Sequence, residues 1–406
     1  MKPSPVVKSH DMSEVGLLSA ELCFSLISIF IGIFLTAHIF VLSGESFVTL
    51  GLFSIVNFIF IFIFQMIGGY ICKKAGSILV LRLSAVFSLM LLIFILNIHD
   101  TLIEYYIILS LVWGGILGFN FSASQFLIAK KTTGEKMLRF VATYTSLVSV
   151  IQLIFPVTFG FIIHIGDFFF TTLLMVLFVT LQIISTLFIK EDVELNDTKM
   201  LFSNFWSDLK KADHKVATLE LWLIIFLTGF ADLISKLVLA FVMLTFNSHL
   251  NLGILISVFA TINIFIPQLY KKSEKSRKFM LSLAIILPLL GIGLLIISGS
   301  MYFIVLLMGV HHTTRGLIYM EEEKTRLSAT SYWIGGEKYV MESNLFYETA
   351  LAAGAVLASF LLVVVGLLYT QTTVIILLAL AVCSFSLHGV LIKLWQKKHI
   401  KNKVAT

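Results

Sequence analysis

Two opposite charges lie in the middle of a long apolar segment. The run Leu221–Phe246 reads LWLIIFLTGFADLISKLVLAFVMLTF and contains Asp232 and Lys236. A charge at the centre of a bilayer costs about 2.5–3.5 kcal/mol. Residues four apart share a helix face, so we expect these side chains to form an ion pair. The sequence leaves open whether the pair faces a wet cavity or statically pins this helix to a neighbour.

A second group of ionisable residues reads HHTTRG and begins at His311. Histidine titrates near neutral pH and can carry a proton at low energetic cost. Arg315, on the same helix face as His311, can bind a carboxylate or phosphate through its guanidinium fork. Alternatively, Arg315 snorkels to the lipid–water boundary. We take His311 and His312, with Asp232 and Lys236, as candidates for proton coupling.

The composition defines the class of protein. The chain of 406 residues is 58% hydrophobic and 13% charged, with a mean hydropathy of +1.00, whereas soluble domains carry about 25% charge. This predicts a polytopic helical membrane protein. The three cysteines lie far apart and suit neither disulfides nor a zinc site.

Hydropathy divides the chain into twelve spans of membrane-crossing length. Their predicted bounds are 16–42, 47–71, 77–97, 103–128, 139–165, 168–189, 219–246, 250–270, 279–299, 301–320, 344–369 and 373–395. The first run is too long for a signal-peptide core, and we expect it to be retained as a helix.

Basic residues indicate the orientation of the chain. Among the 29 Lys and Arg residues, only Lys236 falls well inside a span, and the others gather at one set of connections. This positive-inside pattern places both termini in the cytoplasm of a multi-pass protein of the cell membrane. It also accounts for the net charge of +6 without a nucleic-acid partner.

The longest polar break separates two halves of six spans each. We expect an N-terminal bundle over 1–190, a cytoplasmic linker over 191–218 and a C-terminal bundle over 219–406. Within the linker, MLFSNFWSDLKK (200–211) predicts a short amphipathic helix on the membrane surface. We favour a linker restraint over regulation for it. The later triplet Glu321–Glu323 is interpreted as a solvated helix end.

A glycine-bounded motif follows the second span. Gly69, Lys73, Lys74 and Gly76 form the pattern GYICKKAG. With the two halves, the middle loop and the basic even-numbered loops, this pattern resembles the major facilitator superfamily over nearly the whole chain. Lys73 stands where that family carries an acidic residue. In span five, FPVTFG (155–160) is similar to the end of the proline–glycine motif of the family's drug/proton antiporters.

The resemblance implies an arrangement of the spans. It implies twelve transmembrane helices in two six-helix bundles around a central cavity that spans 1, 4, 7 and 10 line. Glu21, Asn120, Arg315 and Glu348 are then candidates for gating or substrate binding. The alternatives are headgroup-level positions for the two glutamates and a hydrogen bond between helices for Asn120.

We expect a secondary active transporter that works by alternating access, and not an enzyme. The favoured function is proton-coupled export of a small amphiphilic compound by antiport. The alternative is proton-coupled uptake of a small anionic metabolite through Arg315 and Lys236. A lipid-modifying enzyme with a histidine base is disfavoured, because no metal or nucleophile motif accompanies it. We expect a monomer in the lipid bilayer that binds a small-molecule substrate and protons and needs no cofactor.

Overall fold

The computed structural model describes residues 12–131, 135–190, 202–211, 215–272, 274–298, 302–333, 340–368 and 370–399. The first half contains α1 (Met12–Ile29), a π-helical turn η1 (Phe30–Leu35), α2 (Thr36–Leu42), α3 (Phe47–Ala75), α4 (Ser77–Asn97), a 3₁₀ turn η2 (His99–Tyr105), α5 (Tyr106–Lys131) and α6 (Glu135–Leu187). The second half contains α7 (Phe202–Lys211), α8 (Lys215–Ala231), α9 (Leu233–Phe246), α10 (His249–Lys272), α11 (Glu274–Ser298), α12 (Tyr302–Trp333), α13 (Val340–Leu368) and α14 (Gln371–His399).

The helices reproduce the predicted spans. The continuous helix α6 reverses direction at Asp167, whose φ is +79°, so it comprises spans five and six. Nine helical segments in the described part of the chain are long and apolar enough to cross a membrane. The largest difference is in α12, which continues to Trp333, although the sequence predicted that span ten ends at 320.

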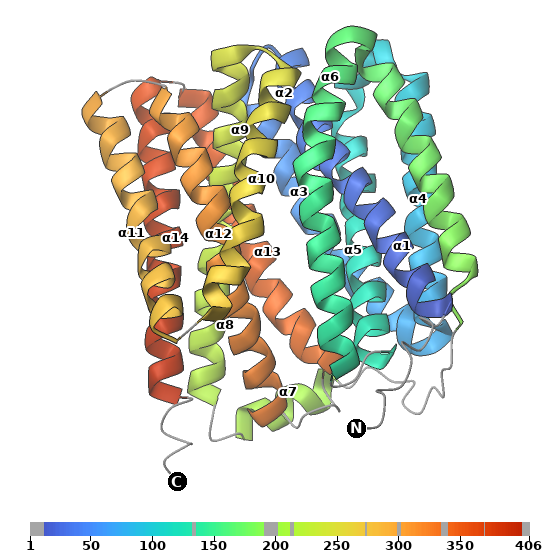
Figure 1. The fold of residues 1–406 in the computed structure, drawn as a ribbon, viewed down its shortest axis with the longest axis vertical. Coiled ribbons are helices and arrows are strands. Elements are labelled where there is room, and N and C mark those ends of the chain that lie inside the picture. The colour runs from blue at the N-terminus through green and yellow to red at the C-terminus, as the bar shows by residue number, and fades with distance from the viewer. Residues whose placement is uncertain are drawn as a thin grey trace, which may run out of the picture.

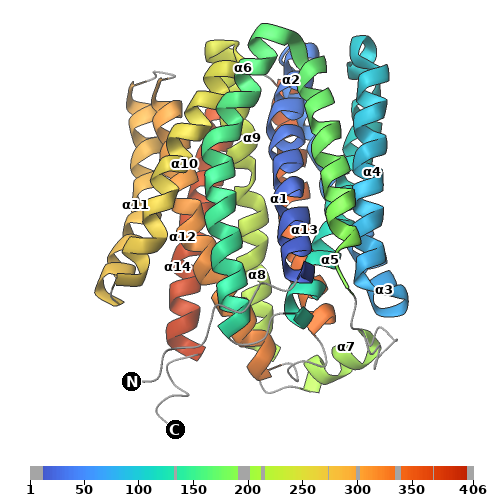
Figure 2. The same cartoon turned by 45° about the vertical axis from the view of Figure 1, so that its right-hand side comes forward.

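The helix α7 has the predicted amphipathic face and lies across one end of the bundle, called here the α7 end (Figures 1 and 2). Phe205 and Leu209 are buried against α8 and α13, and Lys210 is exposed. The ring of Phe205 lies 5.9 Å from that of Phe346. The apolar face of α7 therefore attaches the linker to the second half.

Two seams join the halves. Along one, α3 packs against α13, and along the other, α6 packs against α10. At the second seam, Gly253 lies so close to the carbonyl oxygen of Pro156 that a Cβ atom would overlap it, and Gly160 meets the carbonyl oxygen of His249 in the same way. α6 stays helical through Pro156. Small residues thus permit backbone contact between the halves.

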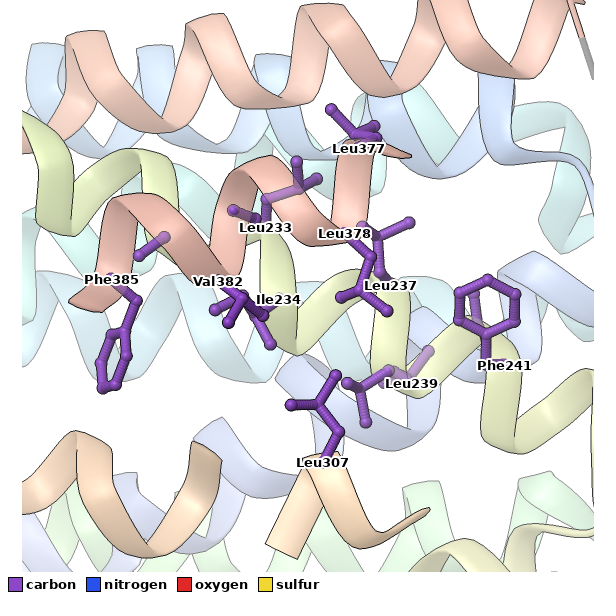
Figure 3. Packing of buried hydrophobic residues seen from close by; sticks show 14 of the residues in the cluster. Leu233, Ile234, Leu237, Leu239, Phe241, Leu307, Leu377, Leu378, Val382 and Phe385 are labelled. Atoms are coloured by element: carbon purple, nitrogen blue, oxygen red, sulfur yellow. The ribbon is translucent and has the colours of Figure 1, made fainter. Parts of the chain in front are cut away.

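A large apolar cluster fills the second half between α9, α12 and α14 (Figure 3). Leu233, Ile234 and Leu237 of α9 face Leu378 and Val382 of α14 there. Several ionisable residues described below lie beside this cluster, so their partners must come from polar side chains of neighbouring helices.

The closest approach within the first half depends on two glycines. A Cβ atom on Gly114 or Gly118 of α5 would lie 2.5 Å from the carbonyl oxygen of Asn57 or Ile61 of α3, respectively.

We predict that Gly118→Ala lowers the free energy of unfolding by about 1–3 kcal/mol through overpacking. Thermal unfolding in detergent measures it. The control Gly293→Ala, with open space around its Cβ, should be neutral or stabilising by less than about 1 kcal/mol. Equal effects of the two changes would contradict the predicted contact.

Candidate functional site: a charged cavity in the second half

Span seven has a local irregularity at Asp232, between α8 and α9, called here the break, although Asp232 itself keeps helical dihedral angles of −60° and −22°. The Asp232 amide donates to the carbonyl oxygens of both Thr228 and Gly229 at 3.2 Å, and the Asp232 carbonyl accepts from the Ser235 amide at 3.1 Å. These bonds tighten the helix for one turn. Gly229 permits the break to lie directly against the backbone of α13 at Leu351. The carboxylate therefore leaves the chain at an irregular point of the helix.

Asp232 pairs with Arg315 of α12. The guanidinium Nη2 lies 2.8 Å from the carboxylate Oδ1, and Nη1 donates to the hydroxyl of Ser235 at 3.0 Å. The arginine side chain is 50% exposed and the aspartate 21%. Among the described residues, no direct ion pair joins Asp232 to Lys236, so the expected i,i+4 pair is wrong. The fork of Arg315 binds the carboxylate and the hydroxyl together, which one ammonium four residues away does not.

A small cavity adjoins this pair. Its volume is about 20 Å³, room for about one water molecule. The lining residues come from α8, the helix break, α12 and α14: Thr228, Ala231, Asp232, His311, Arg315, Ile318, Glu322, Phe385 and His388. Candidates from spans seven and ten thus meet at one point, which lies inside the second half.

Two ionisable residues of this cavity, Glu322 and His388, were missed by the sequence prediction. Glu322 is buried, which corrects its interpretation as part of a solvated helix end, and its Oε2 lies 2.9 Å from Nε2 of His388. The hydroxyl of Thr228 donates to the same carboxylate oxygen at 2.7 Å and lies 2.9 Å from the same imidazole nitrogen. Glu321 is buried too and accepts a hydrogen bond of 2.8 Å from Gln396.

A periodic signal for Glu322 existed in the sequence. His311, Arg315, Glu322 and Arg326 follow one another at intervals of four, seven and four, which repeats one helix face every eleven residues. That face becomes visible only once α12 is continued past residue 320. His388 had no comparable signal, because it is a single histidine in an apolar span.

The other predicted residues occupy different places. The imidazole of His311 is buried and meets the ring of Phe385 edge-on at 4.9 Å, whereas the side chain of His312 lies outside the described residues. Glu21 of α1 and Asn120 of α5 are buried in the first half, away from this cavity. Their roles stay predictions.

Glu348 of α13 is paired within the second half. Its carboxylate lies 3.3 Å from the guanidinium of Arg326 on α12. Neither residue lines the charged cavity. The role of Glu348 as a gate or substrate residue therefore stays a prediction, while its partner is now identified.

The motif after span two forms a link between the halves. Lys73 of α3 reaches Glu342 of α13, with Nζ 2.6 Å from Oε1 and exposures of 11% and 0% for the two side chains. Gly76 adopts φ +101°, a conformation that favours glycine, and joins α3 to α4. Gly69 is buried, and Lys74 is exposed beside the ring of Tyr70. Lys73 thus provides a cross-half ion pair near the α7 end, although the family pattern has an acid at its position.

The long apolar helices and the seams between two halves indicate a polytopic membrane protein. A sequence model of the Major Facilitator Superfamily matches residues 16–319, and the chain belongs to that superfamily. A crystal structure of a POT family transporter in complex with 5-aminolevulinic acid has a similar fold, with a TM-score of 0.67 and 12% identity over 98% of each chain. No curated protein matches the chain.

The family and the fold confirm the predicted class, an all-α transporter of the membrane that is not an enzyme. The division into three regions stays a prediction. So does the central chamber between the halves, whereas the cavity that holds the paired charges lies inside the second half.

We predict that Glu342→Gln destabilises the protein and opens the α7 end. Removing one partner leaves the buried Lys73 ammonium without its counter-charge, at a cost of about 3–5 kcal/mol. Thermal unfolding in detergent measures the loss, and distances between spin labels on α3 and α13 measure the opening. The exchanged pair Lys73→Glu/Glu342→Lys should recover part of both. The control Lys74→Gln removes an exposed charge, and an equal effect from it would contradict a specific link.

Proposed function

We propose that the protein is a proton-coupled secondary transporter of a small anionic compound, in which Asp232 and Arg315 exchange partners. The observation that carries this proposal is their partly exposed ion pair at the break in span seven. When Asp232 is ionised, it neutralises Arg315. When Asp232 binds a proton, the guanidinium loses its partner and can accept a carboxylate or phosphate of the cargo.

The exposure of the pair makes this exchange inexpensive. An ion pair open to water contributes only about 0–1 kcal/mol, so a cargo carboxylate can replace Asp232 at little cost. The buried Lys73–Glu342 pair has no such freedom. The proton and the anion thus favour each other's binding, and this reciprocity is what coupled transport requires.

Lys236 supports the preference for an anion. It follows Asp232 by one helical turn and is half-buried, so it contributes a second positive charge near Arg315. Arg315 and Lys236 are then two cations beside the carboxylate of Asp232, while the other carboxylate of the cavity, Glu322, lies against His388. Protonation of Asp232 removes one negative charge next to the two cations and so favours an anionic cargo. This corresponds to the uptake alternative of the sequence prediction.

The export of an amphiphilic compound remains a second candidate because of another cavity. It has a volume of about 610 Å³ and lies at the α7 end, between α3 of the first half and α7, α8 and α13 of the second. Its lining is apolar apart from Thr349: Phe62, Met66, Phe205, Trp206, Leu219, Trp222, Leu345 and Phe346. Such a lining suits an apolar or amphiphilic molecule of moderate size.

For the transport cycle we propose that the regions 1–190 and 219–406 move against each other, restrained by the linker 191–218. The basic residues near the α7 end support a cytoplasmic position for that end and for both termini. The Lys73–Glu342 pair then holds the cytoplasmic side closed.

We predict that Asp232→Asn abolishes proton-driven accumulation but retains exchange of cargo across the membrane. Lactate and succinate serve as radiolabelled probes in proteoliposomes, after a thermal-shift screen of carboxylates. A pH difference of about one unit supports roughly tenfold accumulation per coupled proton, and the variant should lose this while exchange at equal pH continues. Unchanged pH dependence would exclude Asp232 as the coupling residue.

We further predict that Arg315→Lys raises KM for the anionic probe about tenfold or more, because an ammonium lacks the bidentate fork. The control Lys74→Gln should leave KM unchanged.

The direction of the driving gradient decides between the two candidate functions, uptake of an anion and export of an amphiphilic compound. Accumulation toward the alkaline side supports co-transport of an anion with protons, and accumulation of an amphiphilic cation toward the acidic side supports export.

A further inference from the structure

The most deeply buried ionisable pair of the cavity is not the pair assigned above. The side chains of Glu322 and His388 are 5% and 1% exposed and belong to α12 and α14. Thr228 of α8 hydrogen-bonds to both. Three helices thus converge on one carboxylate, whose charge requires either an imidazolium or a bound proton as compensation.

The neighbouring arginines of α12 each have a carboxylate partner. Arg315 is bonded to Asp232 and Arg326 to Glu348, and Arg326 also interacts electrostatically with Glu322. The side chains of α11 that meet α12 and α14 near this point are apolar, with Ile285 against Ile318 and Gly389. His311, also on the cavity wall, is an ionisable neighbour without a fixed charge.

The pair is adjacent to the coupling residue. Thr228 precedes Asp232 by one helical turn on α8, and both line the cavity that has room for about one water molecule. Glu322 lies seven residues beyond Arg315, about 10 Å further along α12. This displacement is toward the α7 end, because α12 runs from the opposite end to that one (Figure 1).

We propose that Glu322 and His388 form a second proton-binding site, which exchanges a proton with Asp232 through one water molecule in the cavity. The inference rests on the proposed function of Asp232. In the transfer, the Asp232 carboxyl gives its proton to the water, and the water gives one of its own to the Glu322–His388 pair. Asp232 becomes an anion again and binds Arg315, which releases the cargo anion from the guanidinium.

Thr228 permits both states of the pair. When Glu322 is ionised, the hydroxyl of Thr228 donates to the carboxylate oxygen of Glu322, as in the structure. With Glu322 protonated, the hydroxyl rotates and accepts from the carboxyl group, because a threonine oxygen is both donor and acceptor. The site therefore gains or loses a proton without a change of helix packing.

Infrared difference spectra of the purified full-length protein test the proposal without any cargo. The pH is lowered from about 8 to about 5, and the ring bands of the imidazolium are recorded together with the carboxylate and carboxyl stretches. We expect one component to disappear in Glu322→Gln, and the same component to change frequency in Thr228→Val, which removes the hydroxyl. Asp232→Asn should remove a different component. The control Glu321→Gln changes a neighbouring buried carboxylate bonded to Gln396 and should leave both components intact.

Transport by the same variants separates a proton site from a structural role. Glu322→Gln and His388→Gln should reduce accumulation from roughly tenfold to about onefold per pH unit and change exchange at equal pH by less than about threefold. An equal loss of both activities, or wild-type spectra for Glu322→Gln, would overturn the second site. If Glu322→Gln does not fold, an unchanged spectrum of Thr228→Val overturns it instead.

The two proposals can fail separately. Loss of coupling in Asp232→Asn with normal coupling in Glu322→Gln leaves the proposed function standing and removes only the second site. Absence of proton-driven accumulation in the wild type removes the proposed function, while the infrared component of Glu322 still decides whether the pair binds a proton.

Discussion

A charge inside an apolar helical bundle must find a partner there, and this constraint organises the second half of the molecule. Desolvating an ion costs several kcal/mol, which only a close partner and further hydrogen bonds offset. In the described part of the chain, the pairs Lys73–Glu342, Asp232–Arg315, Arg326–Glu348 and Glu322–His388 each join two different helices or helix segments. α12 contributes to three of them and α13 to two. These helices are therefore fixed to their neighbours by specific polar contacts in addition to apolar packing.

The pairs differ in how freely they can separate. Lys73 and Glu342 are both almost fully buried between the halves, so their contact is expensive to break and suits a conformational link. Asp232 and Arg315 are partly open, so their contact can be exchanged for another. Glu322 and His388 are buried, but their charges depend on a proton and can be neutralised without separation. Burial thus determines which change of a pair costs the least free energy: separation, exchange of a partner or binding of a proton.

The sequence predicted the features that depend on local composition. Spans follow from runs of apolar residues, which explains why eleven of the twelve spans end close to the predicted bounds. The end of α12 was misplaced because Glu321, Glu322 and Arg326 lower the local hydropathy, although tertiary contacts bury them. The partner of Asp232 was misassigned for a related reason. Arg315 is 83 residues away in the chain, and spacing within one helix offers only Lys236.

The contribution of α14 shows what sequence reasoning about this fold leaves out. The resemblance assigns the lining of the central cavity to spans 1, 4, 7 and 10, so a histidine in span twelve had no expected role. His388 nevertheless points inward to Glu322 and Thr228, because the cavity lies within the second half and not between the halves. Such a position keeps a proton away from both lipid and cargo. If protons move inside one half while cargo moves between the two, the routes meet only at Asp232 and Arg315. The strength of coupling then depends on that single contact, since a proton that bypasses it cannot affect the binding of the cargo.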